Sequence, residues 1–213
     1  EASAVFMADG YAQSSGKFGV ALVTAAPGFT NSLGPLFAIN SNQSPVLLLS
    51  GDSPIGQKNM MSFQELDQPK ISKGLVKKSL RVEKTEEVGK EIANAIKIAL
   101  SGRPGPVHIA IPFDILNQEV KEANIPNSKD YTPFTKNLNN KDKDILFSEI
   151  SKSIKPIIIT SPSLSKSRNR NLYKNLSKSI NIPMITMASP RGSNDPSNGR
   201  LKEILFQADM IIF

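Results

Sequence analysis

Apolar residues along the first half of the chain follow an order that predicts alternating helices and strands. Three apolar runs, each bounded by Gly or Pro, predict buried strands: GVALVT, SPVLLLSG and GPVHIAIP. The sequence opens with an apolar stripe at helical spacing, made of Ala4, Val5, Ala8 and Ala12. The pattern predicts a parallel sheet with crossover helices.

Two further helices are predicted between these strands. The segment NSLGPLFAINSN reads as a helix that Gly34 and Pro35 interrupt. Residues 85–100 form the clearest helical pattern, in which Thr85 is expected to be the N-cap. Their position between strands fits the same parallel architecture.

The pattern changes after residue 112. Asn, Lys, Pro and Ser then dominate up to about residue 140, which is typical of a linker. A second alternation follows, with strands KPIIITS, IPMITM and ADMIIF separated by helical segments. We therefore expect a first domain at 1–115, a linker at 116–140 and a second α/β domain at 141–213.

Composition describes an ordinary globular chain. It has 213 residues, 39% of them hydrophobic, and no cysteine, so disulfides and thiolate metal sites are excluded. No apolar run approaches the roughly 18 residues of a membrane span, and no signal segment opens the sequence. We expect a cytoplasmic protein without a membrane partner.

The formal charge of +7 raises the question of nucleic-acid binding. Most of the excess lies in the second half, in segments such as SKSRNRNLYKNLSKS. That segment reads as a solvated lysine-rich helix face, because it lacks the interleaved aromatic residues of single-strand binders. We expect no nucleic-acid partner; an acidic protein partner is the alternative.

Two polar segments follow predicted strands, where open α/β sheets bind ligands. In TAAPGFTNS, Pro27 and Gly28 form a tight turn, and Thr30 or Asn31 could cap the next helix. This motif alone also fits a purely structural turn. The segment SFQELDQ is consistent either with a loop over a cleft or with a helix start.

Other chemistries find little support. The only histidine, His108, lies within a predicted strand, where a satisfied structural role is the more common one. The sequence contains no P-loop, no complete Gly-x-Gly-x-x-Gly, no Gly-x-Ser-x-Gly elbow and no calcium loop. We expect no hydrolase triad and no metal site in these residues.

The order of these motifs carries a specific resemblance. A Glu heading a helix with MADGYAQSSGKFGV, then TAAPGFTN, SPVLLLSGDSP, FQELDQ and SGRPGPVHIAIPFDI, resembles the pyrimidine-binding domain of thiamine diphosphate-dependent enzymes of the acetolactate synthase group. The second half resembles the central domain of those enzymes. The resemblance implies a flavodoxin-like parallel-sheet domain followed by a Rossmann-like α/β domain, each incomplete in this sequence.

The resemblance also implies site residues. Glu1 matches the glutamate that hydrogen-bonds N1′ of the aminopyrimidine ring, where a carboxylic group assists proton transfer. Cofactor binding is assigned to Pro27, Gly28, Asn31 and Gln64, and the substrate cleft to Phe29 and Phe63. Many relatives have Gly at the position of Ala26 and a small residue at that of Phe29, so we expect a bulkier loop here.

The resemblance implies decarboxylation or carboligation of a 2-oxo acid substrate by a homodimer or tetramer. Its alternatives are a 2-hydroxyacyl-CoA lyase or oxalyl-CoA decarboxylase, and a non-catalytic nucleotide-binding or interaction protein. The Gly-Asp-Gly and Asn motif that holds Mg²⁺ and the diphosphate is absent. We therefore expect this chain alone to be inactive. FAD is a possible ligand of the second domain, where Arg191 in SPRGSNDP could meet a phosphate.

Overall fold

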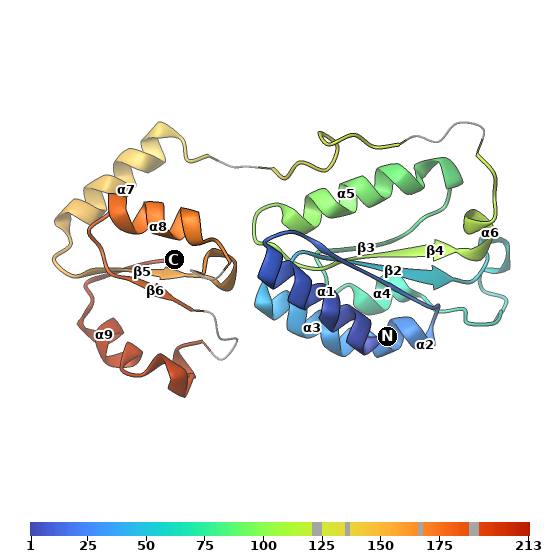
Figure 1. Cartoon of the computed structure of the whole chain (residues 1–213), viewed down its shortest axis with the longest axis horizontal. Coiled ribbons are helices and arrows are strands. Elements are labelled where there is room, and N and C mark those ends of the chain that lie inside the picture. Colours follow the sequence, from blue (N-terminus) through green and yellow to red (C-terminus); the bar gives the residue numbers. More distant parts are fainter. Residues whose placement is uncertain (121–124, 135–136, 166–167, 188–191) are drawn as a thin grey trace. The chain divides into compact units, whose positions relative to one another are not determined.

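The computed structural model describes residues 1–120, 125–134, 137–165, 168–187 and 192–213 (Figure 1). These residues form two compact units, Glu1–Thr135 and Lys136–Phe213. The expected linker, 116–140, crosses the boundary between them. The possible phosphate contact Arg191 lies outside the described residues.

The first unit is built on a four-stranded, fully parallel sheet. Its strand order is β1-β2-β4-β3, where β1 is Gly19–Val23, β2 is Val46–Asp52, β3 is Lys78–Arg81 and β4 is Val107–Pro112. This confirms the predicted α/β class with parallel strands. Strand β3 was not predicted from the sequence; it lies at the sheet edge and pairs with β4.

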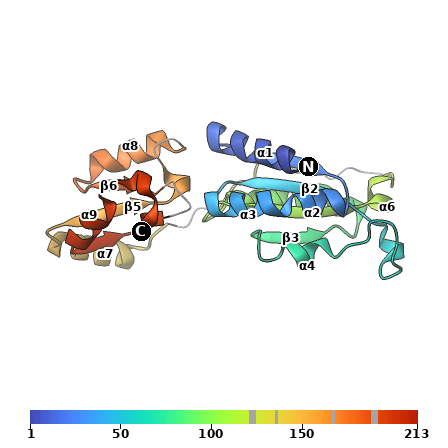
Figure 2. The same ribbon diagram turned by 90° about the horizontal axis from the view of Figure 1, so that it is seen from below.

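Helices cover both faces of this sheet (Figures 1 and 2). They are α1 (Ala2–Ser15), α2 (Pro27–Asn31), α3 (Leu33–Asn42), α4 (Gln68–Ser72), α5 (Val88–Leu100) and α6 (Phe113–Leu116), with short 3₁₀ turns at Ile55–Gln57 and Thr85–Glu87. Side chains of α1, α2 and α3 pack with Leu48 in one core, whereas those of α5 pack with Leu47 and Ile109 in another. Alternation along β2 thus feeds two cores, as a doubly covered strand requires.

A glycine sets the distance between α1 and β1. A Cβ added to Gly19 would lie 2.1 Å from the carbonyl oxygen of Ala8, so no larger residue fits without moving the helix. Val5, Ala8 and Ala12 are buried on the helix face that this contact brings to the sheet. The close approach fixes the spacing between α1 and the start of β1.

Two local predictions were wrong. The helical segment after β1 breaks at Ser32, between α2 and α3, and not at Gly34 and Pro35, which lie inside the first turn of α3 where Pro is tolerated. Thr85 does not cap α5: it begins a 3₁₀ turn, and its hydroxyl donates to the side-chain oxygen of Gln118.

The second unit has a three-stranded parallel sheet of order β6-β5-β7. Its strands are β5 (Pro156–Thr160), β6 (Met184–Thr186) and β7 (Met210–Ile212), and its helices are α7 (Asn140–Lys152), α8 (Arg170–Ser179) and α9 (Leu201–Gln207). Short 3₁₀ turns lie at Pro162–Leu164, Gly192–Asn194 and Pro196–Asn198. The central strand β5 is the most buried, and the lysine-rich helix α8 buries no residue fully.

Candidate functional site

A cleft lies at the carboxyl ends of β1, β2 and β4. Its volume is about 380 Å³, and its lining includes Thr24, Ala25, Gly51, Asp52, Phe63 and Gln64. Parallel strands that end together leave backbone groups pointing at such an edge, which is why open α/β sheets bind ligands there. The predicted residues Phe63 and Gln64 are among the lining residues.

Glu1, the N-cap of α1, lies beside Gly28 of α2. A Cβ added to Gly28 would lie 3.2 Å from Glu1 Cγ and 3.5 Å from Glu1 Oε1. The same Cβ would lie 2.8 Å from Thr24 Cγ2, and Thr24 is also a cleft-lining residue. The structure therefore brings together the residue predicted to be catalytic and a residue predicted to bind the cofactor.

Helix α2 begins with strained backbone at Ala26, which has φ 41° and is therefore in the region that favours glycine. Pro27 occupies the first turn, where its missing N–H costs nothing. Neither Thr30 nor Asn31 caps the next helix, α3, whose N-cap is Ser32. The Thr30 hydroxyl donates to the Pro27 carbonyl at 3.0 Å, and Asn31 is exposed.

The structure places Phe29 outside the cleft. Its side chain is fully buried in the core shared by α1, α2 and α3, and its ring centroid lies 4.7 Å from that of His108. The expectation that Phe29 lines the substrate cleft is not supported, because the short helix α2 turns this side chain inward while Pro27 and Thr30 face outward. Phe63, by contrast, is 86% exposed at the cleft.

The loop before α4 is held by its own carboxylates. Glu65 accepts hydrogen bonds from the backbone N–H of Asn59 and, at 3.1 Å, from that of Ser62. The bond from Asn59, followed by that from Ser62, lowers the pKa of Glu65. Asp67 is the N-cap of α4 and accepts from the Lys70 N–H at 3.2 Å. The segment is thus both a loop at the cleft and a capped helix start.

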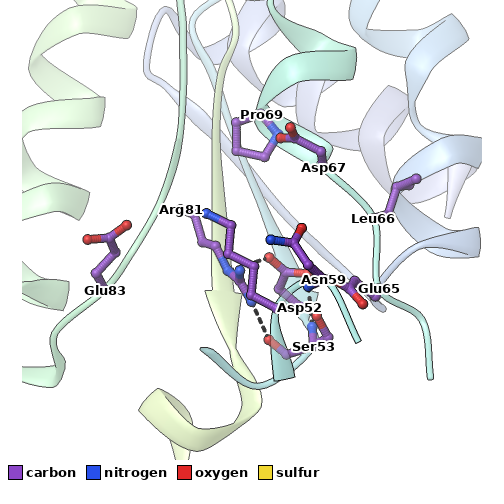
Figure 3. A pocket seen from close by; sticks show the side chains of 10 residues that line it. Asp52, Ser53, Asn59, Glu65, Leu66, Asp67, Pro69, Arg81 and Glu83 are labelled. Carbon is purple, nitrogen blue, oxygen red and sulfur yellow. Dashed lines mark hydrogen bonds and ion pairs between the residues drawn. The ribbon is translucent and has the colours of Figure 1, made fainter. Parts of the chain in front are cut away.

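A second cavity, of about 180 Å³, adjoins the cleft, and Asp52 and Ser53 line both (Figure 3). Arg81 Nε lies 2.9 Å from Asp52 Oδ2, and the Arg81 guanidinium also donates to the Ser53 carbonyl at 2.5 Å. Burial raises the pKa of Asp52, and the Arg81 charge offsets part of that effect. Sequence reasoning missed this pair because β3, which carries Arg81, was not predicted.

His108 has the satisfied structural environment expected of it. The ring is fully buried, Nε2 lies 2.8 Å from Ser50 Oγ, and Nδ1 lies 2.7 Å from Ser79 Oγ. Burial lowers the pKa of His108 from 6.5 to about 3. The ring is therefore neutral at physiological pH and buried without an unsatisfied charge.

The described residues hold no group of three or more His, Cys, Asp or Glu side chains that could bind a metal ion. Within the same part of the chain, no helix has the length and apolar character needed to cross a membrane.

Comparison with protein families gives a match over residues 1–71 to the model described as thiamine pyrophosphate enzyme, N-terminal TPP binding domain. The match covers 71 of the 213 residues. The matched residues contain α1, β1, α2, α3, β2 and the loop up to α4, and so include most of the cleft. The matched segment therefore contains Glu1, Gly28 and Gln64.

Similarity to curated proteins extends beyond that domain. The chain is 34% identical to the acetolactate synthase large subunit of Buchnera aphidicola subsp. Acyrthosiphon pisum over 91% of this chain and 34% of the relative. It is 32% identical to the isozyme 3 large subunit of Escherichia coli over 87% of this chain and 33% of the relative. It is 31% identical to the mitochondrial acetolactate synthase catalytic subunit of Saccharomyces cerevisiae over 96% of this chain and 31% of the relative. The chain spans about a third of the length of these relatives.

Proposed function

We propose that this chain is the cofactor-binding part of a thiamine diphosphate-dependent enzyme that decarboxylates a 2-oxo acid and joins the product to an acceptor, as acetolactate synthase does. The observation that carries the proposal is the placement of Glu1 beside Gly28 and close to Thr24, which lines the same cleft as Gln64 and Phe63. The family match over residues 1–71 and the similarity to acetolactate synthase subunits support it.

The residues present fit an aminopyrimidine ring. Gly28 lets the side chains of Thr24 and Glu1 pack against the backbone of α2, because a Cβ there would lie 2.8 Å from Thr24 Cγ2 and 3.2 Å from Glu1 Cγ. Glu1 is exposed, so its carboxylate can hydrogen-bond a ring nitrogen. Pro27 fixes the start of α2, and the exposed Asn31 side chain at its end is available for a polar contact.

Each residue has a separate task in this proposal. Thiamine diphosphate supplies, when bound, a nucleophilic carbon and an acceptor for the electron pair that decarboxylation leaves. Glu1 holds a proton at the ring nitrogen, and general acid–base assistance of this kind contributes about 10²- to 10⁴-fold to rate. Gln64 orients the cofactor, and Phe63 contributes apolar surface on the substrate side of the cleft.

Finer features belong to the same proposal. In the complete enzyme, Mg²⁺ and the diphosphate are held by residues beyond the present sequence, since the relatives are about three times as long. The cleft then lies between subunits of a homodimer or tetramer in the cytoplasm. The proposal extends to FAD as a ligand of the second domain, on the basis of the family resemblance.

The test is an assay of the complete protein that contains these residues. Purified protein is offered pyruvate, longer 2-oxo acids and acyl-CoA substrates, with and without thiamine diphosphate and Mg²⁺. We expect 2-oxo acid consumption that requires both additions, and no turnover from the 213-residue chain alone. Turnover that is independent of thiamine diphosphate, or activity restricted to acyl-CoA substrates, would overturn the proposal.

A further inference from the structure

A chain of buried polar groups runs under the cleft, from β3 through β4 to β2. It joins Ser72 and Gln68 of α4, Ser79 of β3, His108 of β4 and Ser50 of β2. All of these except Ser79 are fully or almost fully buried, and Ser79 is partly buried. Buried hydroxyls and imidazoles that all find partners stabilise one arrangement of the elements that carry them.

The direction of each hydrogen bond follows from Gln68. Its Nε2 donates to the Gly51 carbonyl at 2.8 Å, so its Oε1 faces Ser50 and can only accept. The Ser50 hydroxyl must give its proton to that oxygen, at 2.7 Å. Ser50 Oγ is then available to His108 only as an acceptor.

The tautomer of His108 is fixed by the same logic. Nε2 must carry the proton, because it lies 2.8 Å from an oxygen that has already used its own. Nδ1 of the neutral ring is then unprotonated and accepts from the Ser79 hydroxyl at 2.7 Å. Ser72 completes the chain, since its hydroxyl lies 2.9 Å both from Ser79 Oγ and from the Gln68 carbonyl.

This network reaches two walls of the proposed cofactor site. Through Ser50 and Gln68 it holds the Gly51 carbonyl, and Gly51 lines the cleft. Through ring packing it contacts Phe29, whose centroid lies 4.7 Å from that of His108 at an interplanar angle of 36°. Phe29 directly follows Gly28, so the His108 ring also supports α2 from below.

We propose that His108 is a positioning residue for the cofactor site: the neutral ring, protonated at Nε2, holds the carboxyl end of β2 and helix α2 at a fixed separation. The role in cofactor binding rests on the proposed function, whereas the geometry of the network does not. It predicts that loss of the ring loosens α2 and Gly51 together while the α5 side of the sheet keeps its order.

The first test uses the fact that the chain contains one histidine. In the 213-residue chain labelled with ¹⁵N-histidine, the ring gives a single pair of nitrogen signals. We expect Nε2 to carry the proton at neutral pH and Nδ1 to show the shift of an unprotonated nitrogen that accepts a hydrogen bond. A ring protonated at Nδ1, at both nitrogens, or exchanging between tautomers would overturn the proposal.

The second test compares the His108→Gln and His108→Leu variants with the unsubstituted chain by amide hydrogen exchange. Gln keeps a donor that can reach Ser50, whereas Leu keeps only the apolar volume. We expect exchange in α2 and at residues 50–52 to accelerate at least tenfold in His108→Leu and less in His108→Gln, with α5 unchanged. Equal acceleration throughout the first unit, or none at α2, would contradict a positioning role.

A third measurement separates this inference from the proposed function. In the complete enzyme, His108→Leu is expected to raise the KM for thiamine diphosphate by about 10- to 100-fold, because small displacements of positioned groups have large effects. We expect His108→Gln to recover part of that loss. If the complete protein proves not to use thiamine diphosphate, the nitrogen shifts and the exchange pattern still decide the geometry of the network.

Discussion

Glu1 and Gly28 lie side by side, so that a Cβ on Gly28 would be 3.2 Å from Glu1 Cγ and 2.8 Å from Thr24 Cγ2. Gly28→Ala is therefore expected to displace both side chains and to weaken thiamine diphosphate binding to the complete enzyme about tenfold, with a loss of about 1–3 kcal/mol in unfolding free energy. Calorimetric titration and urea unfolding measure the two effects.

The matched control for that substitution is Gly10→Ala, at an exposed helix position where an added Cβ meets nothing within 4 Å. It is expected to leave cofactor affinity unchanged and to stabilise the helix by about 0.5–1 kcal/mol. Unchanged affinity in Gly28→Ala would show that the close packing of Glu1 against Gly28 is not needed for cofactor binding.

Ala26 is a point of local strain, with φ 41° just before α2. Ala26→Gly relieves that strain, which exceeds the added chain entropy of glycine, so we expect unfolding free energy to rise by about 1 kcal/mol. The control is Ala38→Gly in the interior of α3, which is expected to lower the unfolding free energy by about 1 kcal/mol. Thermal unfolding of the two variants shows whether their effects have opposite signs. A destabilised Ala26→Gly chain would contradict the backbone described here.

The pair Asp52–Arg81 is expected to contribute far more to stability than the pair Lys78–Glu91. The Asp52 side chain is 2% exposed and that of Arg81 16%, whereas Lys78 and Glu91 are 38% and 24% exposed and 3.7 Å apart. Arg81→Met leaves a buried carboxylate without its partner and should cost about 3 kcal/mol. Lys78→Met should cost less than about 1 kcal/mol by the same urea titration. Similar losses of unfolding free energy in the two variants would contradict the larger contribution expected of the buried pair.

His108 should make stability depend on pH. The pKa of His108 is about 3 in the folded chain against an ordinary value of 6.5. Between these two pH values the unfolded chain therefore binds a proton at His108, whereas the folded chain does not. The contribution of the neutral His108 ring to the free energy of unfolding is fully present above pH 6.5 and is lost as the pH falls toward 3. Between pH 7 and 5 the unsubstituted chain should lose about 2 kcal/mol more than His108→Gln. If the unfolding free energies of the two chains changed equally between pH 7 and 5, the result would be inconsistent with a buried neutral ring.

The sequence predicted those parts of the fold whose signals are local and strongly apolar. Strands β1, β2 and β4 are bounded apolar runs, and the stripe through Val5, Ala8 and Ala12 is buried as expected. Strand β3 was missed because the four residues KSLR are all only partly buried at the sheet edge, so no apolar run marks them.

The roles of the site residues stay predictions, and motif order indicated the placement of only some of them. Placement of Gln64 and Phe63 at the cleft agrees with the expectation from FQELDQ, but the inward direction of Phe29 depends on the five-residue helix α2 and its break at Ser32. The network through His108 could not be foreseen either, since Ser50, Gln68 and Ser79 are far apart in the sequence. Only the pairing of β2, β4 and β3 brings them together.

The decisive measurement is turnover of a 2-oxo acid by the complete enzyme carrying Glu1→Gln. Glutamine keeps the shape and the hydrogen-bonding oxygen of the side chain but cannot exchange a proton as a carboxylate does. We expect turnover to fall about 10²- to 10⁴-fold, with the circular dichroism spectrum and unfolding midpoint unchanged. Turnover within twofold of that of the unsubstituted enzyme would contradict the role assigned to Glu1 and, with it, the site proposed for this chain.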